Sequence, residues 1–252
     1  MPYTTFARQT AANPKRLFWD LLRDPNLVML HMLNETSGST AYDRCTKNSI
    51  DGTLTNTPTQ GVTLGNGFTG MTFAAASSEY IDLGSPNSLG PGLLMNRTDP
   101  LSAVALCNVN NTAAHKAIAS YCSSAMVNGW FFGIDSVESM WVRLSNSAGD
   151  LISVQSDVAV TTGALLMPGF SYSGSGAAAG VIEYLGGVAV AATALADGWA
   201  SGTATYAGST ANIGAASGAD RFFDGTLGIV AVFNAAKSAN DFSRWARLAG
   251  LL

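Results

Sequence analysis

The sequence predicts an all-β protein, a two-sheet antiparallel jelly-roll sandwich with a short N-terminal helical arm and a short C-terminal helix. Two observations lead to this prediction. Short apolar, β-branched or aromatic runs recur along the chain, and Gly, Asn, Ser or Pro separates them. That spacing is typical of sandwiches rather than of alternating strands and helices. Apolar residues also make up 47% of the 252 residues, which is enough to fill a core between two sheets.

The composition limits the function as well. Charged residues make up only 12% of the chain, about half the usual share, so small polar residues must cover much of the surface, as on an extracellular or virion exterior. The net charge of -4 and the lack of basic clusters larger than a pair argue against nucleic-acid binding. We expect synthesis in a host cytoplasm without a signal peptide and no insertion into a membrane, because no apolar run is long enough for either.

Residues 1–25 are expected to form an arm ahead of a single domain over residues 26–252. Asn13 can cap a helix, Pro14 fits the first helical turn, and apolar residues then recur at helical spacing until Pro25. About ten residues are too few for a stable isolated helix. The helix therefore packs on its own domain or docks on another protein. The residues expected to make the docking contact are Phe18, Trp19 and Leu22.

From Leu27 onward the pattern predicts strands, followed by one more helix. The helix begins at Ser238, which forms a capping box with Asp241, and ends at Gly250. The expected strands cover residues 27–33, 70–73, 79–83, 101–109, 116–121, 129–134, 139–144, 151–156, 164–173, 180–185, 187–191, 211–213 and 225–233.

The three cysteines, Cys45, Cys107 and Cys122, cannot all pair within the chain. Without export signals, buried free thiols are favoured over a bridge between Cys107 and Cys122. The chain has only two histidines and no Cys-x-x-Cys motif, so a zinc site is not expected.

A family resemblance begins in the opening segment. An apolar run, Leu27–Leu33, leads through a polar, Gly-containing turn at residues 34–43 into Asn48-Ser-Ile-Asp-Gly-Thr-Leu54. This order resembles the start of laminin-G-like, concanavalin A-like jelly rolls, and the resemblance extends over residues 26–250. It implies a fold that mostly binds or scaffolds. Further segments that resemble the family are residues 68–73, 78–84, 101–106, 181–188, 212–214, 223–227 and 230–234.

Some members of this family are β-glucanases, which need two carboxylates on one strand. Their strand reads Glu-x-Asp-x-x-Glu, and the resembling segment here is Gly133-Ile-Asp135-Ser-Val-Glu138. Because Gly133 stands where the nucleophile would be, no catalytic residue is predicted. Asp135 and Glu138 are instead expected in a solvated turn between two strands.

The resemblance also implies a calcium site, since many laminin-G-like domains bind calcium through carboxylate and carbonyl oxygens. It assigns Asp43, Asn48 and Asp51 to this site, and calcium is the one cofactor expected. The alternative is that Asp43 and Asn48 cap turns through their own side chains. The closing strand carries Gly228-Ile229 where family members often add an acid.

Glycan binding favours an exposed aromatic side chain beside hydrogen-bonding groups. Trp199 lies in a Gly-rich loop sequence, so we expect it to be exposed and to contact a glycan, with Asp197 and Tyr206 beside it. Tyr172 lies in another Gly- and Ser-rich segment and is a further candidate. Trp130 and Trp141 lie within strands and are expected to pack in the core.

The leading hypothesis is a non-enzymatic bacteriophage protein, a decoration or fibre component on the virion surface. Its arm would dock on a capsid or tail protein, its jelly roll would contact a host-surface glycan, and it would form a homo-oligomer. The alternative is a soluble lectin-like carbohydrate-binding module, and the third hypothesis is an atypical glycoside hydrolase.

Overall fold

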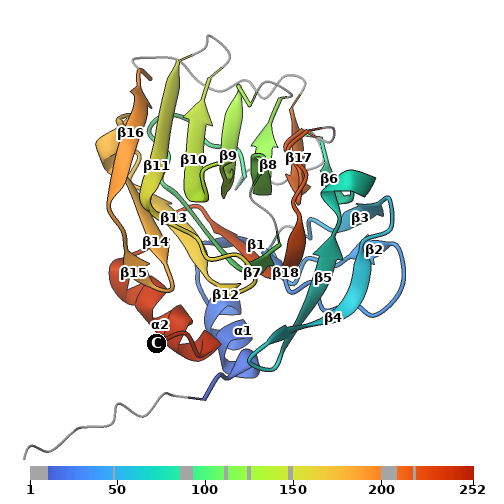
Figure 1. Cartoon of the computed structure of the whole chain (residues 1–252). Coiled ribbons are helices and arrows are strands. Elements are labelled where there is room, and N and C mark those ends of the chain that lie inside the picture. The colour runs from blue at the N-terminus through green and yellow to red at the C-terminus, as the bar shows by residue number, and fades with distance from the viewer. Residues whose placement is uncertain are drawn as a thin grey trace, which may run out of the picture.

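Two antiparallel sheets lie face to face, and two helices lie side by side beneath one of them (Figure 1). The structure is a computed structural model and describes residues 11–47, 49–85, 93–110, 113–123, 126–146, 150–199, 209–217 and 220–252. This architecture confirms the predicted jelly-roll sandwich. None of the helices in these ranges is long and apolar enough to cross a membrane.

Sheet A carries the helices. Its described strands follow the order β15-β14-β13-β7-β18-β5-β4, with β1 pairing to β18 and β12 pairing to β7. The strands are β1 (Leu27–His31), β4 (Thr59–Gly65), β5 (Phe68–Phe73), β7 (Leu101–Val109), β12 (Leu165–Leu166), β13 (Pro168–Tyr172), β14 (Val181–Leu185), β15 (Val188–Ala189) and β18 (Gly225–Phe233).

Sheet B forms the other layer, with its described strands in the order β16-β11-β10-β9-β8-β17-β6-β3-β2. The strands are β2 (Thr40–Ala41), β3 (Gly52–Thr55), β6 (Tyr80–Gly84), β8 (Lys116–Cys122), β9 (Gly129–Ile134), β10 (Ser139–Ser145), β11 (Leu151–Ala159), β16 (Ala192–Asp197) and β17 (Thr210–Ile213). Two short 3₁₀ helices, η1 (Ala75–Ser77) and η3 (Ala178–Gly180), lie between strands.

The predicted strands missed β2, β4 and β16, which lie at the ends of their sheets. β16 consists mainly of Ala and Thr, and glycine interrupts the alternation of β4, so neither has a strong strand pattern. Pairing with one neighbour strand holds each of them in place, and this pairing is a tertiary contact.

The main core lies between the two sheets, where alternate residues of each strand point inward. In β10, Met140, Val142 and Leu144 join this core, whereas Trp141 and Arg143 point to the outer face of sheet B. Trp130 packs between the sheets, as expected. Trp141 is also buried, but in a separate cluster on the outer face of sheet B.

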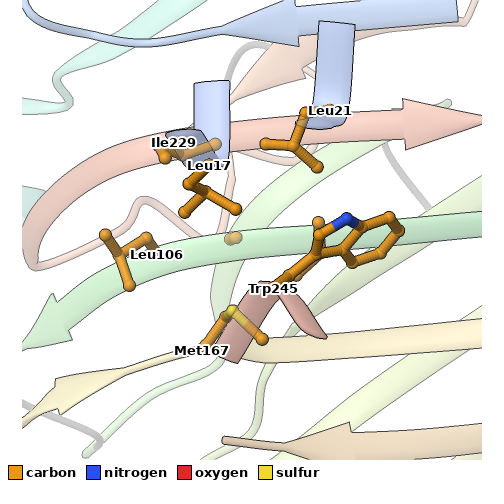
Figure 2. A pocket seen from close by; sticks show the side chains of 8 residues that line it. Leu17, Leu21, Leu106, Met167, Ile229 and Trp245 are labelled. Atoms are coloured by element: carbon orange, nitrogen blue, oxygen red, sulfur yellow. The ribbon is translucent and has the colours of Figure 1, made fainter. Parts of the chain in front are cut away.

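The outer face of sheet A is covered by α1 (Pro14–Leu22) and α2 (Ala239–Ala249). Figure 2 shows Leu17 and Leu21 of α1 and Trp245 of α2 converging on side chains of this sheet. The cavity left among them holds only about 10 Å³, so the apolar packing is nearly complete. The expected caps are confirmed: Asn13 accepts a hydrogen bond from the Arg16 amide, and Ser238 forms a capping box with Asp241.

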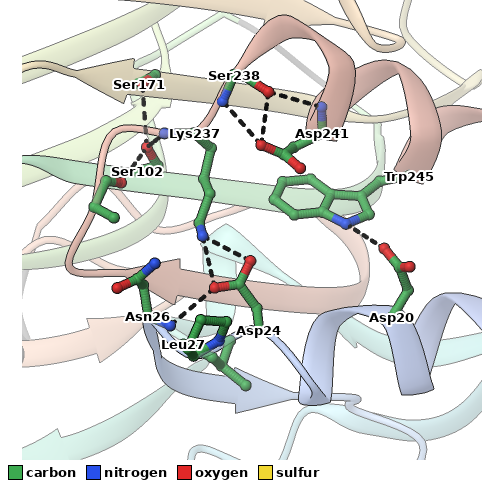
Figure 3. A network of polar contacts seen from close by, with 12 residues as sticks. Asp20, Asp24, Asn26, Leu27, Ser102, Ser171, Lys237, Ser238, Asp241 and Trp245 are labelled. Atoms are coloured by element: carbon green, nitrogen blue, oxygen red, sulfur yellow. Dashed lines mark hydrogen bonds and ion pairs between the residues drawn. The ribbon is translucent and has the colours of Figure 1, made fainter.

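Polar contacts also tie α1 to the segment around α2 (Figure 3). Lys237 forms an ion pair with Asp24, and Asp20 accepts hydrogen bonds from the side chains of Trp245 and Arg244. Helix α1 therefore packs on its own domain, which was one of the two alternatives. Phe18 and Leu22 are half-buried against the same cluster, whereas Trp19 is 51% exposed.

The cysteine prediction is confirmed. Cys45, Cys107 and Cys122 are free thiols, and all three are buried.

Candidate functional site

Three of the residues predicted to bind a glycan, Tyr172, Asp197 and Trp199, come together, but as a structural cluster near Arg97. The Arg97 side chain donates a hydrogen bond to the backbone oxygen of Trp199 over 2.7 Å, and the Tyr172 hydroxyl donates to the backbone oxygen of Arg97. The Tyr172 hydroxyl also accepts from the Gly176 amide, and Asp197 accepts from the Ala178 amide. These bonds fasten the loops at the edge of both sheets.

The predicted exposure of Trp199 is wrong, and Tyr172, the further glycan-binding candidate, does not reach the surface either. Trp199 is 1% exposed and Tyr172 is fully buried, and both belong to the core between the sheets. A large aromatic side chain at the end of edge strand β16 gains more free energy by filling this core than by facing water. Asp197 is exposed, and Tyr206 lies outside the described residues.

The carboxylates assigned to calcium bind backbone amides. One oxygen of Asp43 accepts hydrogen bonds from the amides of Leu30 and Cys45, and the other accepts from the amide of Ile50. Asp51 in turn accepts from the Asp43 amide over 2.8 Å.

These bonds make Asp43 the turn-capping residue of the alternative interpretation and leave it poorly suited to a cation. Asn48 lies outside the described residues. Over the ranges that the structure covers, no group of three or more His, Cys, Asp or Glu side chains is arranged to hold a metal.

The segment that resembles the glucanase motif has no room for a nucleophile. A Cβ atom at Gly133 would lie 2.1 Å from the Lys116 carbonyl oxygen and 2.7 Å from the Phe131 ring. Asp135 accepts hydrogen bonds from the amides of Val137 and Ser139, so it shapes the turn between β9 and β10. The prediction of a solvated turn holds for the exposed Glu138 but is wrong for Asp135, which is buried.

Without a side chain at Gly133, aromatic rings gather on the outer face of sheet B. Trp141 pairs with Gly133 across β9 and β10, and its ring centroid lies 5.1 Å from that of Phe131. The centroid of the His115 ring lies 5.0 Å from that of the same indole. The indole nitrogen of Trp141 donates to the Ser153 hydroxyl over 2.8 Å, which fixes the ring.

Beside these rings, a hollow of about 300 Å³ opens at the start of β8. It is lined by Ala75, Ala114, His115, Lys116, Asp220, Arg221 and Phe222. The Ala117 amide donates to the Arg221 carbonyl over 2.8 Å, which holds the loop against β8. Phe222 packs against Tyr80 with 6.0 Å between ring centroids. We call this the β8 hollow.

Arg221 carries positive charge into the β8 hollow. It forms an ion pair with Asp220, and its Nε atom is buried without a hydrogen-bond partner among the residues that the structure describes. Arg143 lies close by: burial lowers the pKa of its guanidinium, and the positive charge of Arg221 lowers that pKa further.

Our sequence reasoning missed the residues of the β8 hollow. Lys116 and Arg221 are far apart in the sequence, and only the packing of the loop against β8 brings them together. A local signal existed in His115-Lys116 at the start of a predicted strand, but a single basic pair is common on protein surfaces.

The sequence matches the family model of the concanavalin A-like lectin/glucanases superfamily over residues 75–242, which is more than half of the chain. The chain belongs to this superfamily. No curated protein matches the sequence significantly.

Several solved structures share the fold of this chain at low sequence identity. The binding domain of Paraclostridial Mosquitocidal Protein 1 has a TM-score of 0.61 and 9% identity, with 88% of this chain and 52% of that chain covered. Domain 4 of AbnA, a GH43 extracellular arabinanase from Geobacillus stearothermophilus, was solved in complex with arabinotriose. It has a TM-score of 0.57 and 15% identity, with 88% of this chain and 98% of that chain covered.

A Trypanosoma rangeli sialidase in complex with sialic acid gives a TM-score of 0.58 at 11% identity, with 90% of this chain and 33% of that chain covered. This chain thus spans about half the length of the mosquitocidal protein's binding domain and about a third of the length of the sialidase. These likenesses show a lectin-like jelly-roll fold.

Proposed function

We propose that the protein is a non-enzymatic carbohydrate-binding domain and that the β8 hollow is its binding site. The observation that carries this proposal is the pairing, in one hollow, of ring faces with hydrogen-bonding groups. Phe222 and His115 supply the rings, while Arg221 supplies donors and Asp220 an acceptor. Small-molecule sites commonly combine an apolar wall with a few placed polar groups.

Two further observations support binding rather than hydrolysis. The position of the glucanase nucleophile is a glycine whose Cβ site is already filled by the Lys116 carbonyl group and Phe131. The carboxylate of the neighbouring acid, Asp135, accepts hydrogen bonds from backbone amides. The arabinanase domain of similar fold was solved with arabinotriose, which agrees with a sugar-binding use of this architecture.

A glycan array screened with the full-length chain tests the proposal. Phe222→Ala and His115→Ala should each weaken binding to any glycan that the wild type retains. Tyr42→Ala is the matched control, because Tyr42 is an exposed aromatic residue of the segment between β2 and β3. Equal loss in all three variants, or no glycan bound by the wild type, would contradict the proposal.

We also propose that this domain is a decoration or fibre component of a bacteriophage virion, where it forms a homo-oligomer and attaches to a capsid or tail protein. The sparse charge of the chain supports an exposed virion surface. Trp19, 51% exposed on α1 beside Phe18, offers an apolar contact. Since α1 packs on its own domain, attachment would use a face of the folded domain rather than a separate arm.

Mass spectrometry of purified virions tests this second proposal. The protein should be present in stoichiometric amounts, and Trp19→Ser should reduce its incorporation without changing its melting temperature. Absence from washed particles would refute the virion role and leave the soluble lectin-like module as the interpretation.

A further inference from the structure

The outward face of α1 surrounds an exposed tryptophan with three cations. Trp19 lies four residues after Lys15, three after Arg16 and four before Arg23, the residue that caps the helix. Side chains at these spacings are neighbours on a helix, so Trp19 stands at the centre of the group. The guanidinium carbon of Arg23 lies 5.8 Å from the centroid of the Trp19 ring. All four residues are exposed, since the apolar face of α1 packs on sheet A.

A hollow continues this positive charge from α1 onto α2. It measures about 340 Å³ and lies between the start of α1 and the end of α2. Among the described residues, Arg16, Arg244 and Arg247 line it, and no Asp or Glu does. Arg244 is paired with Asp20 and Asp241, whereas Arg247 is exposed and adds its charge to that of Arg16.

Five exposed residues together form what we call the cationic face: Lys15, Arg16, Trp19, Arg23 and Arg247. In the part of the chain that the structure describes, none of its four cations forms an ion pair. The carboxylates of Asp20, Asp24 and Asp241 are engaged in other contacts (Figure 3). The cationic face therefore carries unbalanced positive charge, although acids outnumber bases 17 to 13 in the whole chain.

A protein partner fits the cationic face better than a membrane or a nucleic acid does. Insertion into a membrane needs an apolar helix face, and that of α1 is buried on sheet A. Domains that bind nucleic acids carry an excess of basic residues, whereas this chain has a net charge of -4. Trp and Arg side chains are the residue types that most often dominate the binding energy between two proteins.

We propose that the cationic face docks on an acidic surface of a partner protein. Arg16, Arg23 and Arg247 pair with carboxylates of that surface, and Trp19 packs in an apolar depression among them. The inference rests on the proposed attachment to a capsid or tail protein and names the chemistry of the surface that receives α1. Complementary charge steers the encounter and fixes the orientation of the two proteins.

The first part of the test uses a random copolymer of glutamate and tyrosine, which combines carboxylates with apolar rings. It is titrated into the full-length protein, and binding is measured by calorimetry. Arg16→Gln and Arg23→Gln should each weaken binding about fivefold, and Trp19→Ala should weaken it as well. Val137→Glu is the control, because it changes the net charge by the same amount as each arginine variant at an exposed turn between β9 and β10. All four variants change exposed side chains, so their melting temperatures should match that of the wild type.

Two further probes represent the other classes of partner. Vesicles of phosphatidylglycerol and a DNA duplex are titrated in the same way, and both should bind more weakly than the copolymer. If either probe bound at least as tightly as the copolymer and depended on Arg16 and Arg23, the partner would be a membrane or a nucleic acid. Copolymer binding that is equal in the wild type and the arginine variants would overturn the cationic face as a docking surface.

Purified virions separate this inference from the virion role itself. On particles that carry the protein, Arg16→Gln and Arg23→Gln should reduce its incorporation, and high salt should release it, because salt screens exposed charges. Incorporation that responds to neither change would overturn the acidic surface and leave the virion role intact. Absence from virions, together with arginine-dependent binding of the copolymer, would refute the virion role and keep an acidic protein as the partner.

Discussion

The ammonium group of Lys237 lies 2.6 Å from both carboxylate oxygens of Asp24, and this pair joins the end of α1 to the start of α2. Both side chains are nearly buried, and the ammonium group also lies 4.9 Å from the centroid of the Phe233 ring. The two helices are therefore held on sheet A by charge as well as by apolar packing.

Removing one partner of this pair should destabilise the domain strongly. Asp24→Ala leaves a buried ammonium group and should lower the free energy of unfolding by about 3–5 kcal/mol, as for other broken buried pairs. Arg244→Gln, which breaks the more exposed pairs with Asp20 and Asp241, should cost less than about 1 kcal/mol. Urea unfolding measures both, and equal small losses would mean that the Asp24 pair is effectively solvated.

Truncation should distinguish an integral helix from a detachable arm. Deleting residues 1–24 removes Leu17, Leu21 and Asp20, and this exposes the face of α2 that includes Trp245. We expect this truncated chain to aggregate or to melt non-cooperatively. Calorimetry of the truncated and the full-length chain checks this, and a stable domain without residues 1–24 would mean that α1 is a detachable arm.

Asp43 should stabilise the fold without calcium. Asp43→Asn weakens charge-assisted hydrogen bonds to three amides and should lower the free energy of unfolding by about 2 kcal/mol or more. Melting temperatures are measured in calcium and again in EDTA. The decrease in melting temperature caused by Asp43→Asn should be the same in both buffers. If calcium raised the melting temperature of the wild type alone, Asp43 would be a calcium ligand after all.

Glu183 should make stability depend on pH. Both of its carboxylate oxygens are buried and have no hydrogen-bond partner within the described ranges. Burial, aided by the charges of Asp157 and Asp135, raises its pKa from 4.5 to about 9. The folded state thus holds a proton that the unfolded state releases above pH 4.5. The contribution of Glu183 to stability is full below that pH and is lost as the pH rises toward 9.

Glu183→Gln should therefore become progressively more stable than the wild type between pH 4.5 and 9, by at most about 1.4 kcal/mol per pH unit. Glu138→Gln, at an exposed turn, is the control. Urea unfolding at several pH values measures the difference. A gap between Glu183→Gln and wild type that stays constant with pH would show that Glu183 is ionised in the folded protein.

The missing nucleophile position should not accept a side chain. Gly133→Ala places a methyl group against the Lys116 carbonyl oxygen and should destabilise the domain by about 1–3 kcal/mol. Gly198→Ala is the control, because the nearest atom to its Cβ position, the Leu151 carbonyl oxygen, is 3.8 Å away. If thermal melting showed Gly133→Ala to be harmless, β8 and β9 would have to be more mobile than this packing implies.

Local features of this fold could be predicted from the sequence because short-range physics decides them. Asn13 and Ser238 cap their helices through side chains three residues from the bonded amide, and Gly250 ends α2 in a left-handed conformation. Most strands follow from apolar runs between turn residues, and the order of these runs gave the family. The weak edge strands, β4 and β16, depend on neighbours far away in the chain.

The candidate site depends on contacts between distant segments. The sequence around Trp199 has the composition of an exposed loop, yet its indole is buried in the core between the sheets. The free energy gained by burying a large apolar surface outweighs the local preference for an exposed loop. Lys116 and Arg221 share a hollow only because the loop before β18 bonds to β8. The sequence by itself thus determined the sandwich, its caps and its missing nucleophile, whereas the tertiary structure alone decided which rings are buried and where positive charge gathers.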